Sequence, residues 1–247
     1  MEISFKKKTV LITGGTRGIG KSIAEVFEKS GASLILTGTD PLEIEKFNQI
    51  YGHSNRVYHT LNFKSHKSID SFFNKLDGYP SIDVCVNNAG INIIDDFIKT
   101  NSRDFDLLIA INLKGPYILS KYCAKRMKEA RCGKIINICS IWSEITRPGR
   151  SLYTMTKNAL HGLTQTMAVE LAPYNVMVNS VSPGFTLTDL TMQTNTKDEL
   201  TALEEKIPAK RMAKPEEIAN VVLFLSSEKN SYVTGQNIIV DGGYVIV

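Results

Sequence analysis

The fold is decided by residues 9–20, which read Thr9-Val10-Leu11-Ile12-Thr13-Gly14-Gly15-Thr16-Arg17-Gly18-Ile19-Gly20. The apolar, β-branched start of this stretch is typical of a buried strand. Gly14, Gly18 and Gly20 then allow a tight turn, and apolar residues continue at helical spacing behind them. A helix that begins after such a turn presents free N–H groups and the positive end of its dipole, so we predict a phosphate-binding loop.

The residues around this loop indicate which phosphate ligand it would hold. No Gly-Lys-Ser or Gly-Lys-Thr follows, so the loop is not a Walker loop and we do not expect an NTPase. An acidic residue at the tip of the next strand would bind the ribose 2′-hydroxyl of NAD, but Thr39 stands there and Asp40 only follows it. Arg17 could reach the 2′-phosphate of NADP. We therefore expect NADP, and Asp40 leaves NAD open.

Beyond the loop, short β-branched runs alternate with amphipathic stretches along the whole chain. Further strands are expected at residues 33–36, 56–61, 82–86, 134–139, 176–181 and 237–240. Helical patterns fill the gaps, most clearly at residues 102–130, 152–172 and 216–227. Strands separated by helices imply parallel βαβ units, whose right-handed crossovers place helices on both faces of the sheet. The sequence thus predicts an α/β fold with about seven parallel strands, one doubly wound domain over residues 1–247, and a ligand beyond the carboxyl ends of the strands.

Composition narrows the class of protein. The 247 residues are 43% hydrophobic, enough for a full core, and the net charge of +4 comes from scattered basic residues, so a nucleic-acid partner is not expected. No stretch approaches the roughly 18–20 apolar residues of a membrane span, and no signal peptide is evident. Four cysteines without C-x-x-C spacing favour a reducing, cytoplasmic location, and the histidines show no metal-ligand pattern.

A second pattern carries chemistry. Tyr153 and Lys157 stand four residues apart on a helical stretch and so share one face. An ammonium near a phenol favours the phenolate, which could exchange a proton with a carbonyl or alcohol oxygen. Ser140, expected to end a strand at the same edge of the sheet, could hydrogen-bond that oxygen, and Asn112 could hold a water in a proton relay.

Together these features are similar to the short-chain dehydrogenase/reductase family over nearly the whole chain. The matching motifs are Thr13-Gly14-x-x-x-Gly18-x-Gly20, Asn87-Asn88-Ala89-Gly90, Asn112, Ser140, Tyr153-x-x-x-Lys157, Pro183-Gly184 and the tail Val240-Asp241-Gly242-Gly243. The resemblance implies a Rossmann-type domain and an NAD(P)-dependent oxidoreductase that interconverts a secondary alcohol and a ketone. It also implies a substrate-covering segment at about residues 187–212.

The resemblance assigns a role to each catalytic candidate. Tyr153 would be the general acid/base, Lys157 would favour its phenolate and hold the nicotinamide ribose, Ser140 would polarise the substrate oxygen, and Asn112 would support a proton relay. Besides Tyr153 and Lys157, the residues implied in cofactor binding are Gly14, Thr16, Arg17, Gly18, Ile19, Gly20, Thr39, Asn62, Asn88, Ala89, Gly90, Pro183, Gly184, Thr186 and Thr188.

The substrate is less constrained by the sequence. The stretch just past Ser140, with Trp142 and Glu144, resembles the same stretch in sugar-acid and polyol members of the family. A sugar, polyol or related small metabolite is therefore the leading expectation for the substrate. The overall pattern also resembles 3-oxoacyl-acyl-carrier-protein reductases. Acyl-carrier protein is acidic and would need a basic docking patch, for which residues 126–131 offer three basic side chains.

Two further expectations concern turnover and assembly. A cofactor-binding regulator without turnover is a minor alternative, since such a protein could dispense with the tyrosine or the lysine, and both are present. The family implies a homo-oligomer, commonly a tetramer. The apolar ending at residues 244–247 fits a tail buried either in a subunit interface or against its own domain.

Overall fold

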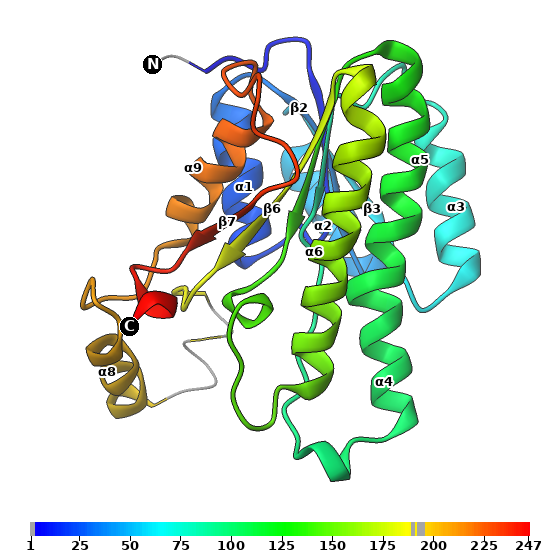
Figure 1. Ribbon diagram of the computed structural model, residues 1–247. Coiled ribbons are helices and arrows are strands. Elements are labelled where there is room, and N and C mark those ends of the chain that lie inside the picture. Colours follow the sequence, from blue (N-terminus) through cyan, green and yellow to red (C-terminus); the bar gives the residue numbers. More distant parts are fainter. Residues whose placement is uncertain (1–2, 189–190, 192–195) are drawn as a thin grey trace.

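The centre of the protein is one parallel seven-stranded sheet, seen in a computed structural model that describes residues 3–188, 191 and 196–247 (Figure 1). The strands are β1 (Thr9–Ile12), β2 (Ser33–Gly38), β3 (Arg56–Thr60), β4 (Val84–Asn87), β5 (Gly133–Ile138), β6 (Val176–Pro183) and β7 (Asn237–Val240). Their order is β3-β2-β1-β4-β5-β6-β7. The predicted strands and the doubly wound α/β fold are confirmed, with differences only at strand ends.

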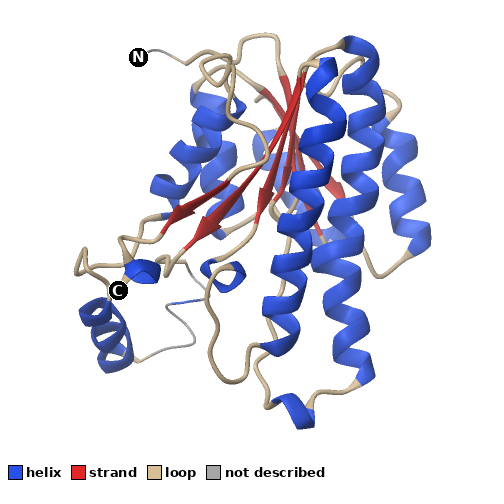
Figure 2. Cartoon of the chain, viewed as in Figure 1, coloured by secondary structure: helices blue, strands red, loops and turns tan. Residues whose placement is uncertain are grey.

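Helices cover both faces of the sheet (Figure 2). The longer helices are α1 (Gly18–Lys29), α2 (Pro41–Tyr51), α3 (His66–Leu76), α4 (Ser102–Leu108), α5 (Gly115–Ala130), α6 (Ser151–Leu171), α8 (Lys197–Lys206) and α9 (Pro215–Ser226). The short turns are η1 (Phe97–Lys99), η2 (Ile109–Lys114), η3 (Ile141–Ser143), η4 (Ala172–Tyr174) and η5 (Tyr244–Ile246). Helices α1, α2 and α9 pack on one face, and α3, α5 and α6 pack on the other.

The continuous apolar runs of the central strands follow from this two-sided cover. Val10 and Ile12 of β1 point into the core beneath α1 and α9, whereas Leu11 points into the core beneath α3 and α5. Strand β2 alternates in the same way, and all these side chains are buried. Successive strand residues face opposite sides, so a strand that is buried on both faces is apolar at most of its positions.

The helix predicted over residues 102–130 is continuous, but a π-helical segment divides it into two α-helices. Helices α4 and α5 are joined by η2, a π-helical segment that contains Asn112. Each π turn takes up one more residue than an α turn, which changes the face that follows. The apolar spacing of the sequence did not show this interruption.

The segment expected to cover the substrate holds α8, which begins with a reciprocal capping box between Thr196 and Glu199. Buried Ile207 and Met212 anchor its later part. Residues 189–190 and 192–195 of this segment lie outside the described residues. At the chain end, Tyr244 packs edge-on against Phe185.

Other sequence expectations concern membranes, thiols and metals. Within residues 3–188, 191 and 196–247, no helix combines the length and apolarity that a bilayer crossing requires. All four cysteines carry free thiols. The same described residues contain no group of three or more His, Cys, Asp or Glu side chains placed to hold a metal ion.

A buried amide network ties the middle of the sheet to the helices on one face. Asn87 Nδ2 donates to Asn137 Oδ1 at 2.7 Å and to Ser120 Oγ of α5 at 2.8 Å. Asn137 Nδ2 donates in turn to Thr164 Oγ1 of α6 at 2.8 Å. All four side chains are buried, so each bond replaces water that cannot reach these groups.

Removing the central amide should therefore be costly. We expect Asn137→Ala to lower the free energy of unfolding by about 2–4 kcal/mol, because it strands polar groups of Asn87 and Thr164 in the core. Urea unfolding followed by circular dichroism measures this change. Asn55→Ala, at an exposed position, is the control and should change stability by less than about 0.5 kcal/mol. Equal effects of the two variants would contradict the structural role of the network.

Candidate active site

A cleft of about 570 Å³ opens at the carboxyl ends of β1, β2 and β4. Within the sheet, β1 has β2 as its neighbour on one edge and β4 on the other, so the strand order reverses at β1. Doubly wound sheets bind their ligands at such a switch point. The predicted residues that line it are Gly14, Thr16, Arg17, Gly18, Ile19, Gly20, Thr39, Asn62, Asn88, Ala89, Gly90 and Thr188.

The glycine loop has the geometry that a pyrophosphate requires. Gly14 and Gly18 adopt φ values of +65° and +54°, where a side chain would be strained. A Cβ atom on Gly20 would lie 2.1 Å from the carbonyl oxygen of Gly14, so only glycine allows this close packing. Helix α1 begins without a side-chain cap at Arg17, which leaves its first N–H groups available to an anion. The residues present therefore fit a dinucleotide.

Asn88 fastens the glycine loop to β4. Its Nδ2 donates to the carbonyl oxygens of Thr13 at 2.9 Å and Gly14 at 3.1 Å. Thr13 Oγ1 accepts the backbone N–H groups of Asn88 and Ala89, both at 3.0 Å. These bonds fix the two walls of the cleft relative to each other.

The charged side chains at the far end of the cleft differ in whether they are free to bind a ligand. One carboxylate oxygen of Asp40 caps α2 by accepting the backbone N–H of Leu42 at 2.9 Å. Arg17 is exposed on the cleft wall, and its side chain has no hydrogen bond to any residue in the described part of the chain. Glu43, which the sequence analysis did not single out, also lines this end.

Lys157 is held in place beside Tyr153. Its Nζ atom donates to the carbonyl oxygen of Ile138 at 2.7 Å and lies 5.6 Å from the centre of the Tyr153 ring. The lysine is buried on α6, so the strand carbonyl fixes its direction. Two further N–H donors of the ammonium remain for a ligand.

Asn112 joins this group from the π-helical segment. Its Oδ1 accepts the backbone N–H of Ile91 at 2.9 Å, and its Nδ2 donates to the carbonyl oxygen of Ile91 at 2.8 Å and to Thr156 Oγ1 at 3.2 Å. Both N–H groups are thus used within the protein, and only Oδ1 could hold a water. A Cβ atom on Gly90 would lie 3.4 Å from Asn112 Oδ1 and 3.5 Å from Lys157 Nζ, so these groups converge at one point.

Ser140 lies two residues beyond the end of β5 rather than at the end of the strand, which corrects the sequence expectation. The strand ladder stops at Ile138, and the Ser140 hydroxyl caps η3 by accepting the N–H of Trp142 at 3.3 Å. Burial raises the pKa of the neighbouring Cys139 thiol to about 11, which keeps it protonated at neutral pH. A thiolate nucleophile is therefore not available there.

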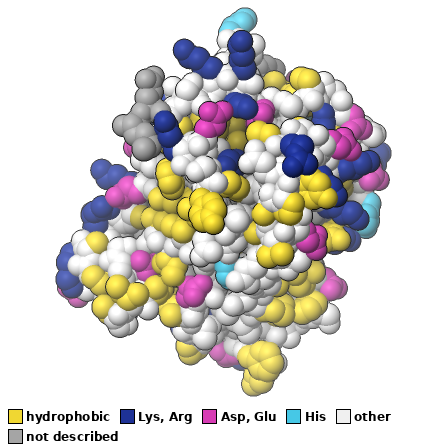
Figure 3. Space-filling model, turned by 45° about the horizontal axis from the view of Figure 1, so that its top comes forward, with side chains coloured by type: hydrophobic (Ala, Val, Ile, Leu, Met, Phe, Trp, Pro, Cys, Tyr) yellow, Lys and Arg dark blue, Asp and Glu magenta, His cyan; other side chains and the backbone are white. Residues whose placement is uncertain are grey.

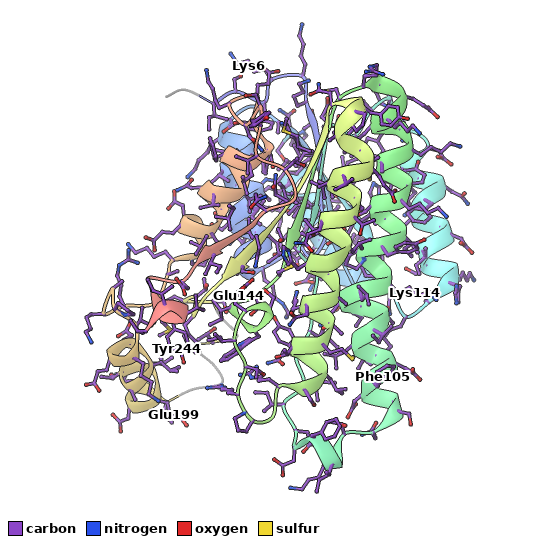
Figure 4. The ribbon with its side chains drawn as sticks, in the orientation of Figure 1. Lys6, Phe105, Lys114, Glu144, Glu199 and Tyr244 are labelled. Carbon is purple, nitrogen blue, oxygen red and sulfur yellow. The ribbon has the colours of Figure 1, made fainter. Side chains whose placement is uncertain are left out.

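Glu144 is tied to the sheet. Its Oε1 accepts a hydrogen bond from Asn237 Nδ2 of β7 at 2.7 Å, and Asn237 Oδ1 accepts one from Ser182 Oγ at 2.8 Å. Glu144 lies beyond the carboxyl ends of the strands, on the same side of the molecule as Tyr244 (Figure 4). This carboxylate therefore borders the active-site end of the sheet while remaining exposed.

Some predicted cofactor residues do not line this cleft. Pro183 ends β6, Gly184 and Thr186 follow it, and Tyr153 and Lys157 lie on α6. A Cβ atom on Gly184 would lie 2.7 Å from the Cα atom of Asp241. The sequence analysis missed several lining residues: Thr37, Gly38, Glu43, Leu61, Phe63, Ile91 and Ile111. Most of these follow or end a strand, a position that the rule for parallel sheets marks as cleft wall. Ile111 comes from the π-helical segment, which the sequence did not reveal.

With this geometry established, comparison with known proteins identifies the class. A family model described as enoyl-(acyl carrier protein) reductase, from the short-chain dehydrogenase/reductase family, matches residues 14–245. The chain belongs to the short-chain dehydrogenase/reductase family. It is accordingly an oxidoreductase of the kind that uses NAD or NADP.

Similar relatives carry two kinds of name. A 3-oxoacyl-acyl-carrier-protein reductase from Aquifex aeolicus is 38% identical over 98% of this chain and 99% of its own length. A provisionally assigned gluconate dehydrogenase from Agrobacterium tumefaciens has a TM-score of 0.94 at 33% identity, covering 100% of this chain and 99% of the other. A gluconate 5-dehydrogenase from Burkholderia cenocepacia, solved with NADP and tartrate, has a TM-score of 0.90 at 27% identity, covering 100% and 98%.

The closeness of Gly20 to Gly14 leads to a test of the loop. We expect Gly20→Ala to lose most affinity for NADPH, because its methyl group must push the Gly14 carbonyl out of position. Fluorescence titration with NADPH measures the affinity. Gly162→Ala is a matched control, since a Cβ atom there meets nothing within 4 Å. It should leave NADPH binding unchanged and stabilise α6 by about 0.5–1 kcal/mol. Unchanged binding in Gly20→Ala would contradict the assignment of the loop.

Proposed function

We propose that this protein is an NADP-preferring oxidoreductase that interconverts a secondary alcohol and a ketone, with Tyr153 as the general acid/base. The observation that carries the proposal is the convergence of Lys157, Asn112 and Gly90 beside Tyr153, at the inner end of the dinucleotide cleft. Bound NADP would supply or accept a hydride at its nicotinamide ring.

The chain's own residues handle the proton. During oxidation Tyr153, as phenolate, takes the hydroxyl proton of the substrate, and during reduction its phenol returns that proton to the carbonyl oxygen. Lys157 places its positive charge beside the Tyr153 ring, and the Ile138 carbonyl holds that ammonium in place. We assign Ser140 to the substrate oxygen and Asn112 to holding the strand-end backbone at Ile91.

The preference for NADP is supported by charge at the adenosine end of the cleft. Arg17 has free donors there, while an oxygen of Asp40 is engaged in capping α2. The solved gluconate 5-dehydrogenase, which is similar to this chain, holds NADP. Asn62 and Thr39 complete the wall that we assign to the adenosine.

We further propose a small polyhydroxylated metabolite of the sugar, polyol or sugar-acid type as substrate. Two solved neighbours of this chain are described as gluconate dehydrogenases, one of them provisionally. The chain holds the exposed carboxylate of Glu144 at the active-site end of the sheet through a hydrogen bond from Asn237 Nδ2, and this carboxylate could accept hydrogen bonds from hydroxyl groups.

The second candidate is reduction of a 3-oxoacyl group on acyl-carrier protein, which the names of the curated relatives favour. The basic residues considered for docking are occupied in the fold: Arg126 donates to the carbonyl oxygen of Leu76 at 3.0 Å, and Lys128 stacks on Tyr174. They lie at the end of α5 that is remote from the cleft (Figure 1). From that end, Lys and Arg side chains are scattered among acidic and apolar ones (Figure 3).

A homo-oligomer and a cytoplasmic location complete the proposal. Exposed apolar side chains on neighbouring helices support an interface between copies, namely Phe105 of α4, Tyr117 of α5 and Val169 of α6. We propose the tetramer common in the family. The four free thiols support a reducing compartment.

The central test removes the phenol. We expect Tyr153→Phe to lower turnover of gluconate with NADP by roughly 10²–10⁴-fold while the protein still binds NADPH, because the proton donor is lost and the other cofactor residues remain. Steady-state kinetics and a binding titration measure the two effects. Wild-type turnover of an acetoacetyl thioester but not of gluconate would favour the second candidate. Absence of turnover with any alcohol or ketone, despite tight cofactor binding, would favour a regulator.

The cofactor preference depends on Arg17. We expect Arg17→Ala to weaken NADPH binding roughly ten-fold or more, because a charged hydrogen bond to the 2′-phosphate is lost. NADH binding should hardly change, since NADH has no such phosphate. Parallel fluorescence titrations give both constants. An equal loss for both cofactors would show that Arg17 contacts the pyrophosphate instead.

A further inference from the structure

Two arginines share one aromatic ring next to the catalytic residues. Trp142 is the only tryptophan of the chain and is 6% exposed. The guanidinium carbon of Arg147 lies 5.1 Å from the centre of its ring, and that of Arg150 lies 5.3 Å away. Phe185 packs edge-on against the same ring. Two like charges are thus gathered at one buried indole.

The charge of Arg150 is not compensated. The residue is 8% exposed, and its buried Nε atom has no hydrogen-bond partner. Neither Arg147 nor Arg150 forms an ion pair with a carboxylate in the described part of the chain. Burial and the nearby charge of Arg147 lower the pKa of Arg150. A buried guanidinium without an anion is costly, which indicates that a partner is missing.

The other buried arginine of the chain shows the usual solution. Arg56 Nε donates to Glu28 Oε1 at 2.8 Å, and its Nη2 donates to the second oxygen of the same carboxylate. It also stacks on an aromatic ring, that of Tyr51. Arg150 has the aromatic ring but lacks the carboxylate. Stacking on a ring leaves the in-plane N–H donors of a guanidinium free, so Arg150 is ready for an anion from outside the chain.

The position of the cluster points to the substrate as the source of that anion. Trp142 follows Ser140 by two residues, and Arg150 precedes Tyr153 by three at the start of α6. Arg150 and Tyr153 are close enough to interact electrostatically. The cluster therefore borders the place where we assign the reacting oxygen, away from the dinucleotide cleft, whose lining does not include it.

We propose that Arg147 and Arg150, held on Trp142, bind an acidic group of the substrate, so that the enzyme acts on an anionic polyol, either a hydroxy acid or a polyol phosphate ester, and on the corresponding ketone. This inference rests on the proposed function and specifies its substrate class. A guanidinium pair suits a carboxylate or a phosphate ester. A 3-oxoacyl thioester has no charge next to its ketone and would leave both arginines unpaired.

The first experiment reads binding without turnover, from the fluorescence of Trp142 in the protein without added cofactor. Gluconate, glucitol and glucitol 6-phosphate are titrated; gluconate and glucitol differ in one carboxylate. We expect one of the acids to bind roughly ten- to hundred-fold more tightly than glucitol. The tighter of the two identifies the acidic group. Equal constants for all three ligands would overturn the proposal.

Variants locate the effect. Arg150→Gln should abolish the preference for the acid over glucitol, and Arg150→Lys, which keeps the charge but loses the planar fork, should retain part of it. Arg147→Gln, at an exposed position, tests the cluster without a large change in the core. Arg131→Gln is the control, since it removes a guanidinium stacked on Tyr174 at the remote end of α5. The proposal would be overturned if Arg147→Gln, Arg150→Lys and a correctly folded Arg150→Gln all kept the wild-type preference for the acid over glucitol.

Kinetics separate this inference from the proposed function. In the wild type, the acid should have a lower KM than glucitol, and the difference should vanish in Arg150→Gln. Turnover of acid and neutral polyol with equal KM would overturn the anion subsite and leave the oxidoreductase intact. Tight binding of the acid without any turnover would support the subsite and overturn the proposed reaction.

Discussion

The site depends on the junction where the ends of β1 and β4 are held together. The Asn88 side chain donates to the carbonyl oxygens of Thr13 and Gly14, and the Thr13 hydroxyl accepts the backbone N–H groups of Asn88 and Ala89 just past β4. Gly20 packs so closely against this junction that no side chain fits. A cleft can form at this edge because two buried strands end together and their helices diverge from there.

The catalytic end is fixed by contacts of the same kind. Lys157 is directed by the backbone carbonyl of Ile138, the last residue of β5, and Asn112 is clamped to Ile91 by a pair of hydrogen bonds. Neither side chain can rotate without leaving a buried polar group unpaired. The acid/base machinery therefore gains its precision from backbone groups, which depend on the sheet being complete.

The guanidinium of Arg150 is an exception among the buried charged side chains of the described chain. Arg56 and Lys157 find partners within the fold, whereas the other buried atoms without a hydrogen bond, Asn87 Oδ1, Ser151 Oγ and Ser226 Oγ, are neutral. An exception next to Ser140 and Tyr153 is expected where a substrate, rather than the protein, supplies the partner. Family membership fixes the reaction class, whereas this local arrangement bears on which substrate is used.

The sequence by itself determined the strands, the alternation of strands with helices that makes the sheet parallel, and the glycine loop. Apolar runs, helical spacing and glycine positions are local properties, so they can be recognised without the structure. The sequence also indicated Tyr153 and Lys157 as a pair, since they are neighbours on one helix. Only the tertiary structure decided that Asn112 sits in a π-helical segment, that Ser140 lies beyond its strand, and that the buried Nε of Arg150 has no hydrogen-bond partner among the described residues. These features depend on contacts between residues far apart in the chain, which no local pattern records.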